Sequence, residues 1–391
     1  MKKGLFSTLL LATAFFSLKA ETFFSGETGV CANFINTKAI GLEPALTLNG
    51  FFSGQLTVSN ALSFRGEFSL RTADLFDKGF TEEADSVFRI TELSGTYTKS
   101  FAGATHTFSL FTGNFESIGS QQFVRRHLGI QSYASPLTEN YLGQNGNTVY
   151  PIYGIGGSYA FTFKSMPLST GIAIVKNGDK ITSDFRLATA FRYFSMDFAG
   201  GFYAPLHTTD ANGDEVFLLI NTVYLHAGID ALFGNNYEVF SLFIQNGFDD
   251  LDIKKKKLDF SEMHLLVEPR INLGAAKFYF TFFSIPNDTA KKMLYLDDTL
   301  GINLNMFSDN RHTEKRDYTV GLNLMFSFEG KHVNDLEDSD LVDAMNIKIS
   351  PYTDIKIADG ILKVMLQGSI IKFTDNKSDA LKLNIGYKKE L

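Results

Sequence analysis

The chain of 391 residues has no tryptophan, a single cysteine (Cys31), and no long apolar run after its first 20 residues. One cysteine excludes an intrachain disulfide and a cysteine-based metal site. Without a further run of about 18 apolar residues, transmembrane helices are excluded, and with them a polytopic helical transporter. A membrane role, if there is one, must therefore use strands.

Catalytic and metal-binding signatures are also missing. The seven histidines are scattered without an HExxH pair, and no G-x-S-x-G motif occurs. The segment Gly154 to Gly157 resembles part of a phosphate-binding loop, but it lies within a strand-like stretch and favours a bend or bulge. We predict that the chain is not an enzyme and binds no cofactor or metal. A protease or lipase whose catalytic residues come together only on folding is the alternative.

The first 20 residues have the three parts of a secretory signal peptide. Lys2 and Lys3 precede the apolar stretch Gly4 to Leu18, and Ala20 is a small residue suited to cleavage. We expect residues 1–20 to be removed, because this stretch is short for an uncleaved membrane-spanning anchor. The mature chain then has 33 basic and 43 acidic residues, a formal charge of −10. This acidic excess argues against a nucleic-acid partner.

Alternation of apolar and polar residues is the main positive signal. Between Ala61 and Arg71, one alternating set is apolar and the other is polar or charged: Leu62, Phe64, Phe68 and Leu70 against Ser63, Arg65, Glu67, Ser69 and Arg71. A period of two places the two sets on opposite faces of a β-strand. Eighteen segments are predicted as strands, with 16 or 20 as alternatives: 28–36, 44–58, 61–74, 86–100, 104–114, 147–164, 168–176, 183–194, 197–205, 215–231, 236–247, 260–273, 276–286, 296–307, 317–329, 344–357, 361–374 and 379–388.

The links between these strands are by turns short and long. Two-residue links such as Ser59-Asn60 alternate with long polar ones, of which 115–146 is the longest. Short turns on one rim and long loops on the other are typical of outer-membrane barrels. Residues 21–391 are therefore predicted to form an all-β, transmembrane, antiparallel up-and-down barrel with a water-filled lumen and both termini periplasmic. A soluble β-sandwich or solenoid, with its apolar faces in a shared dry core, is the alternative.

In architecture, the mature chain resembles Gram-negative porins, loosely the 18-stranded OprD-like and major-porin groups. One local similarity is Ser135-Pro136-Leu137-Thr138, which is similar to a Pro-Leu segment of OprD-like constriction loops. The chain departs from such barrels in lacking a terminal aromatic residue, since it ends in Leu391. The resemblance implies a bacterial outer-membrane porin, surrounded by lipid, that passes small hydrophilic solutes or ions by passive diffusion. It also suggests a homotrimer.

The resemblance further implies that the long loop 115–146 folds into the lumen and narrows it. Arg125, Arg126 and His127 are its densest positive cluster. In a narrow, low-dielectric pore these charges would attract anions. A loop on the outer surface with solvated arginines, or a partner-binding loop, are the alternatives.

Charges on the polar strand faces form a second group of candidates. They are Arg65, Glu67, Arg71, Arg89, Arg186 and Arg192, with the last two assigned to the eighth strand. A charge facing lipid near the bilayer midplane costs about 2–4 kcal/mol, so we expect these side chains to face the lumen. They would sort solutes there, or neutralise one another in salt bridges.

Two other functions remain open. A transporter of hydrophobic compounds of the FadL-like group would carry an N-terminal plug, but only about seven residues separate Glu21 from strand-like sequence. A surface adhesin or structural barrel is the other, and the mostly modest loop lengths disfavour it. We predict a porin with a bias toward anions.

Overall fold

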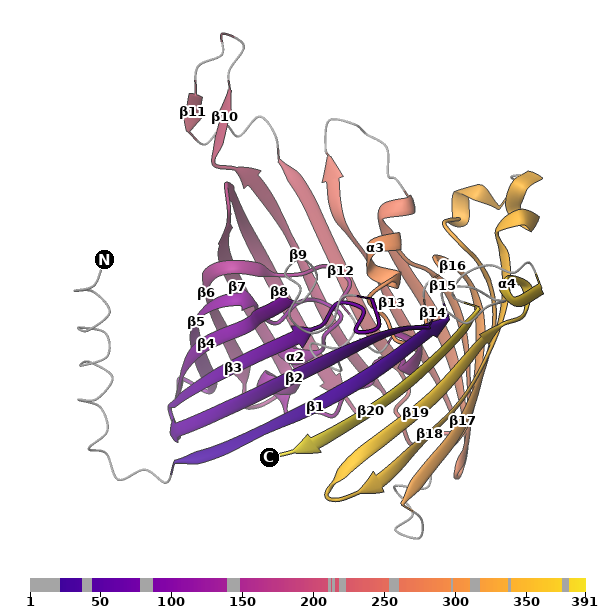
Figure 1. Ribbon diagram of the computed structural model, residues 1–391. Helices are drawn as coiled ribbons and strands as arrows, with labels where there is room; N and C mark the ends of the chain where they lie inside the picture. Colours follow the sequence, from indigo (N-terminus) through magenta and orange to yellow (C-terminus); the bar gives the residue numbers. More distant parts are fainter. Residues whose placement is uncertain are drawn as a thin grey trace.

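In the computed structural model, eighteen strands form one closed antiparallel sheet (Figure 1). The ring closes because β1 (Phe23–Asn36) pairs with both β2 (Pro44–Ser59) and β20 (Leu381–Glu390). The other strands pair with their neighbours in sequence, apart from β9 and β12, which pair across an inserted hairpin. The predicted all-β, up-and-down barrel of 18 strands is confirmed.

The structure describes residues 22–36, 44–77, 87–138, 148–209, 212, 215–217, 223–252, 260–296, 298–309, 317–336, 339–374 and 380–391. The predicted signal peptide 1–20 and the end of the predicted constriction loop, 139–146, lie outside these ranges. None of the described helices is long and apolar enough to span a membrane.

The remaining barrel strands are β3 (Leu62–Arg71), β4 (Val87–Phe101), β5 (Ala104–Asn114), β6 (Tyr153–Phe163), β7 (Leu168–Asn177), β8 (Lys180–Phe191), β9 (Phe194–Pro205), β12 (Tyr224–Phe233), β13 (Phe240–Asp252), β14 (Met263–Leu273), β15 (Ala276–Ser284), β16 (Leu300–Asp309), β17 (Tyr318–Phe328), β18 (Met345–Ile357) and β19 (Gly360–Ser369). The helices are α2 (Gln122–Leu128), α3 (Asn287–Ala290), α4 (Ile370–Thr374) and the short 3₁₀ turns η1 (Pro136–Thr138), η2 (Phe260–Glu262), η4 (Val333–Asp335) and η5 (Ser339–Ala344). A separate hairpin, β10 (His207–Thr209) with β11 (Glu215–Phe217), projects from one rim (Figure 1).

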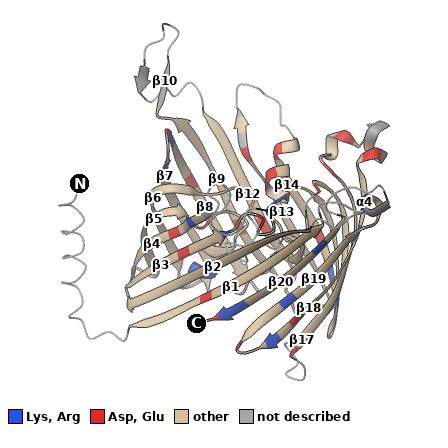
Figure 2. Ribbon diagram, viewed as in Figure 1, with Lys and Arg blue, Asp and Glu red and all other residues tan. Residues whose placement is uncertain are grey.

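The two rims of the barrel differ as the link lengths predict. Tight turns such as Asn60-Ala61, Ala102-Gly103 and Gly274-Ala275 lie on the rim that also carries the C-terminus, at the bottom of Figure 1. Most of the longer connections lie on the opposite rim. Two connections break this rule: the link 310–317 between β16 and β17 lies on the tight-turn rim, and the tight turn Gly178-Asp179 between β7 and β8 lies on the opposite one. In Figure 2, the described helices of that rim carry acidic residues, and lysines lie near the lower ends of β18 to β20.

Several predicted strand boundaries differ from the observed ones, and three of the differences bear on the site residues or the topology. The eighth strand was expected to continue to residue 194, but β8 ends at Phe191 and Arg192 lies in the turn. The tenth was expected to begin at 215, whereas β12 begins at Tyr224 and 215–217 belong to the projecting hairpin. The seventeenth ends at Ser369, where α4 begins. Alternation alone cannot locate these ends, because it continues through turn and hairpin residues.

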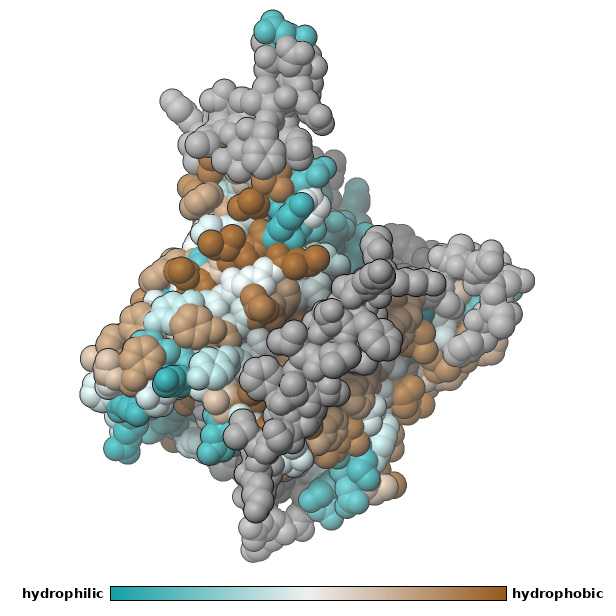
Figure 3. Space-filling view, turned by 90° about the vertical axis from the view of Figure 1, so that its left-hand side faces the viewer, coloured by the Kyte–Doolittle hydropathy of each residue, from teal (hydrophilic) through white to brown (hydrophobic). Residues whose placement is uncertain are grey.

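The strands carry their apolar side chains outward and their polar side chains inward. On β3, Phe64 is 47% exposed while Glu67 is 1% exposed. Across β1 to β4 the outer face carries a row of Phe rings at centroid separations of 6.4, 6.2 and 6.0 Å: Phe24, Phe52, Phe68 and Phe88. Figure 3 shows broad apolar areas on this outer surface. The closed ring and these outward apolar faces exclude a β-sandwich with a shared dry core.

Candidate functional site

The connection between β5 and β6 lies inside the barrel. Ser135 Oγ donates a hydrogen bond of 2.5 Å to Glu268 Oε2, and Arg270 Nη2 donates one of 2.9 Å to the Tyr133 carbonyl. Both partners stand on the inner face of β14. A Cβ added to Gly228 on β12 would lie 3.0 Å from Ile118, so the loop also packs directly on that strand. The described part of the predicted constriction loop, 115–138, therefore occupies the interior.

A buried ion pair holds the start of this loop against the wall. Arg186 on β8 donates two hydrogen bonds to Asp197 on β9, at 2.7 and 2.9 Å, and a third to the Glu116 carbonyl. Its guanidinium also lies 4.8 Å from the centre of the Phe123 ring of α2. Arg186 faces inward as predicted, but it is 3% exposed and lies under the loop. Its observed contacts are with the loop and β9.

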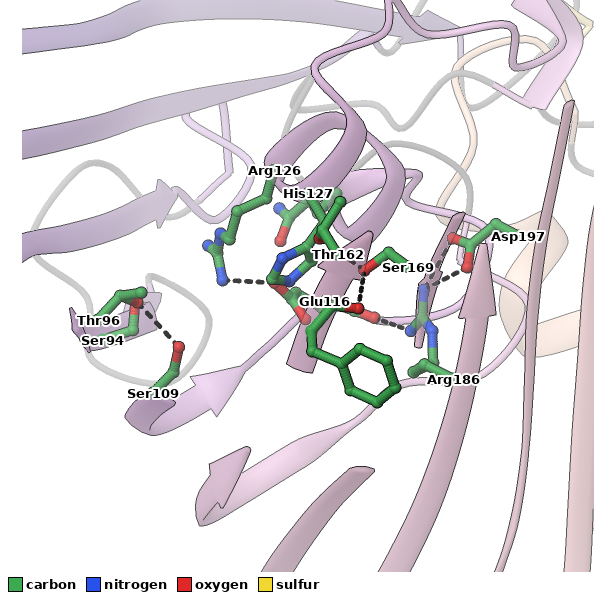
Figure 4. Close-up of polar contacts among 12 residues, drawn as sticks. Ser94, Thr96, Ser109, Glu116, Arg126, His127, Thr162, Ser169, Arg186 and Asp197 are labelled. Atoms are coloured by element: carbon green, nitrogen blue, oxygen red, sulfur yellow. Dashed lines mark hydrogen bonds and ion pairs between the residues drawn. The ribbon is translucent and has the colours of Figure 1, made fainter. Parts of the chain in front are cut away.

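Two arginines and three carboxylates form the central cluster. Figure 4 shows its loop part, where Arg126 and His127 lie beside Glu116. Arg126 of α2 binds Glu116 at 2.7 Å (Nη1 to Oε1) and Glu92 of β4 at 3.4 Å (Nη2 to Oε1). From β3, Arg65 binds the other oxygen of Glu92 at 3.3 Å and Glu67 at 3.1 Å. The Glu92 carboxylate thus links the loop arginine to the strand arginine.

The charge state of Glu116 follows from its neighbours. Burial alone would raise the pKa of its carboxyl group, but Arg126 and then His127 lower that pKa to about 2. His127 Nε2 lies 3.4 Å from the same oxygen that Arg126 binds. Glu116 is therefore an anion at any ordinary pH and keeps α2 in place.

Within this cluster the positive groups are the more exposed ones. The side chains of Arg65 and Arg126 are 26% and 20% exposed, whereas Glu67, Glu92 and Glu116 are 1%, 0% and 6% exposed. The three carboxylates are therefore covered by the protein, whereas the two arginine side chains are partly exposed to an open space.

That space is a cavity of about 220 Å³. Its wall consists of Gln55, Arg65, Arg126, His127 and seven serine and threonine side chains, with no carboxylate and no aliphatic side chain. The hydroxyl groups come from β3, β4, β5 and β6, and the arginines stand at one side of them. Elsewhere among the described residues, no group of three or more His, Cys, Asp or Glu is arranged to hold a metal ion.

A second segment that also turns inward was missed by the sequence reading. Residues Ile285 to Leu296 form an apolar cluster with Phe283, Met325 and Met365 of the inner wall, and Leu137 of the long loop joins it. At its end, Asp298 binds Lys348 of β18 at 2.9 Å. The sequence pattern places this segment mostly in the link between the predicted strands 276–286 and 296–307, although Met293-Leu294-Tyr295-Leu296 is an apolar run that favours burial.

The other predicted residues lie apart from the cavity. Arg125 is an exposed residue of α2, and Arg71 and Arg89 are exposed residues near the long-loop ends of β3 and β4. The assignment of Arg192 to a strand is wrong: it lies in the exposed turn after β8, with its guanidinium 4.9 Å from the Tyr193 ring centre. The structure thus brings together Arg65, Glu67, Arg126 and His127. It adds Glu92 and Glu116, which sequence reasoning did not single out.

No protein-family model matches the chain, and no curated protein matches it in sequence. Solved structures do match in fold. The outer membrane protein opdK from Pseudomonas aeruginosa has a TM-score of 0.51 at 7% identity, covering 94% of this chain and 99% of that one. OccK5 (OpdH) of P. aeruginosa has a TM-score of 0.52 at 9% identity, covering 94% and 98%. A BenF-like porin from Pseudomonas fluorescens Pf-5 has 0.52 at 11% identity, covering 95% and 99%. At these identities the shared property is the barrel fold.

Proposed function

We propose that the chain is a porin of a bacterial outer membrane that passes small hydrophilic solutes by passive diffusion, with a bias toward anions. Residues 1–20 act in this proposal as the cleaved export signal, residues 21–391 as the barrel, and both termini are periplasmic. Loop 115–146 is the constriction, with Arg126 and His127 beside the passage.

The observation that carries the anion bias is the unequal exposure within the central cluster. Guanidinium groups of Arg65 and Arg126 reach the cavity, while the carboxylates that balance them are almost fully covered. A solute in the cavity can contact the arginine side chains, whereas the carboxylates do not line the cavity and lie further from the solute. Low-dielectric walls strengthen this field, so anions are favoured and cations are disfavoured.

The outer face supports the membrane location. Its exposed aromatic and aliphatic side chains suit contact with acyl chains, while inward charges avoid the cost of facing lipid. The solved barrels that share the fold include proteins described as an outer membrane protein and a porin. The homotrimer that the porin resemblance suggests is tested by the mass of the detergent-solubilised protein.

The cavity wall separates this proposal from its alternatives. A transporter of hydrophobic compounds would present an apolar conduit, but this cavity is lined by hydroxyl, amide, imidazole and guanidinium groups. An adhesin or structural barrel needs no such polar passage.

Conductance across a planar lipid bilayer tests the proposal. Purified mature protein should insert in discrete steps, each adding a steady ohmic conductance in KCl. A protein that shifts on heating in a denaturing gel, as a folded barrel does, yet gives no conductance steps would overturn it.

A further inference from the structure

We propose that the cavity beside α2 binds a small polyhydroxylated anion, such as a sugar acid or a sugar phosphate, during its passage. This inference rests on the proposed porin function, because a solute reaches the cavity only through the lumen. It assigns a substrate class to the site on the chemistry of the wall alone.

One side of the cavity suits a carboxylate or phosphate group. Arg65 Nη2 donates hydrogen bonds to Glu67 and Ser53, and its Nε lies 3.3 Å from Glu92 in an ion pair. Arg126 donates from Nη1 and Nη2 to its two carboxylate partners. Arg65 Nη1 and Arg126 Nε make none of these contacts, so each guanidinium keeps a donor for a solute. Planar N–H donors of this kind bind carboxylate and phosphate oxygens with favourable geometry.

The other side suits hydroxyl groups. Ser63, Thr98 and Thr107 come from β3, β4 and β5, and all three line the cavity. Thr98 and Thr107 are direct cross-strand neighbours. Among the described residues, none of these three hydroxyls has a hydrogen-bond partner. Each offers one donor and two acceptor positions. A row of free hydroxyls therefore faces the cavity, next to the arginines.

The wall lacks the groups that would favour an aromatic acid. No Phe, Tyr, Leu, Ile or Val lines the cavity. A flat apolar ring placed there would displace water from Ser63, Thr98 and Thr107 without replacing its hydrogen bonds, which is costly. At about 220 Å³ the cavity holds roughly seven waters at about 30 Å³ each, so it suits a solute of several heavy atoms better than a single ion.

Current block in single channels tests the inference. Four probes are added to the wild-type channel in KCl: galacturonate, galactose 6-phosphate, neutral galactose and benzoate. We expect both sugar anions to interrupt the current for longer than galactose or benzoate. Comparing the block times of galacturonate and galactose 6-phosphate shows whether the arginines favour a carboxylate or a phosphate group. Either result supports the proposal.

A triple variant removes the free hydroxyls while keeping side-chain shape: Ser63→Ala, Thr98→Val and Thr107→Val. We expect it to shorten the sugar-anion blocks by about fivefold or more, the effect of losing at least one net hydrogen bond. Open-channel conductance of the variant is recorded alongside, and block durations are compared with those of galactose and benzoate in the same channels. The control is Thr47→Val, which removes an inward hydroxyl of β2 that accepts a hydrogen bond from Asn33 and does not line the cavity.

Two results would overturn the inference while leaving the porin function intact. One is benzoate blocking as long as galacturonate. The other is a triple variant that conducts normally, shifts on heating as the wild type does, and keeps wild-type sugar-anion blocks. A wild-type protein without conductance steps would instead refute the porin proposal itself.

Discussion

Arg126 of the inward loop and Glu92 of β4 bind each other at 3.4 Å (Nη2 to Oε1), although 34 residues separate them in sequence. The second oxygen of Glu92 binds Arg65. One buried carboxylate therefore fixes two arginines at the cavity and joins the loop to the wall.

Replacing this carboxylate should raise the anion preference. Glu92→Gln removes a negative charge and leaves Arg65 and Arg126 with less compensation, so the field in the cavity becomes more positive. Reversal potentials in asymmetric KCl should move further toward the chloride equilibrium potential. Glu329→Gln is the control, because this carboxylate is 61% exposed and binds Lys372 outside the cavity. A shift toward cation preference in Glu92→Gln would contradict the arrangement.

Arg186 should matter for loop position and stability. Arg186→Ala leaves the carboxylate of Asp197 buried and unpaired, which costs about 3–5 kcal/mol, and frees the Glu116 carbonyl. We expect a lower temperature for the heat-induced gel shift, and a noisier current. Arg192→Ala should leave both unchanged, because Arg192 lies in an exposed turn. Equal effects of the two substitutions would rule out an anchoring role for Arg186.

The position of the second inward segment, Ile285 to Leu296, should depend on the ion pair between Asp298 and Lys348. Lys348→Met removes the cation that binds Asp298 at 2.9 Å and leaves that carboxylate buried. The segment should then leave the wall more often, exposing the backbone at Lys291 and Lys292 of the same segment. Trypsin should cleave there several times faster than in the wild type, and mass spectrometry of the fragments identifies the cut. Unchanged cleavage kinetics would show that the apolar cluster alone holds the segment.

The depressed pKa of Glu116 predicts how the loop responds to acid. A carboxyl whose pKa is lower in the folded than in the unfolded state adds stability that is present above its ordinary pKa of 4.5 and is lost as pH falls toward 2. The stabilisation of the loop by the ionised Glu116 carboxylate should therefore be intact at pH 5 and should decline below about pH 4. Current noise recorded from pH 7 to pH 3 measures this decline.

Glu116→Gln provides the comparison for that titration. This variant lacks the titrating carboxyl group, so its noise should already be high at pH 7 and should change less with acid. A wild type and a variant with the same pH profile would show that other groups control the loop.

The sequence predicted the barrel well, because alternation is imposed along whole strands by the two different surroundings of their faces. The 104–114 segment matches β5 at both ends, and Arg65 and Glu67 face inward as their register requires. Strand ends were less predictable. Arg192 continues the alternating pattern into a turn, and nothing local distinguishes it from a strand residue.

The site depends on contacts that no local pattern encodes. Glu116 becomes important only because the loop folds back and brings it to Arg126 and His127. The segment from Ile285 to Leu296 packs on Met325 and Met365, which lie some 30 to 80 residues further along the chain. Period-two reasoning assigns a face to each strand residue, but it cannot show which loop covers that face.

The reversal potential of the wild-type channel and of an Arg65→Gln, Arg126→Gln double variant, recorded in a tenfold KCl gradient, tests the central claim most directly. The reversal potential of the wild type should lie between zero and the chloride equilibrium potential. That of the double variant should move toward zero or toward the potassium equilibrium potential, while the channel still conducts. A wild-type channel that prefers potassium, or a double variant with unchanged selectivity, would contradict an anion-selective passage formed by these two arginines.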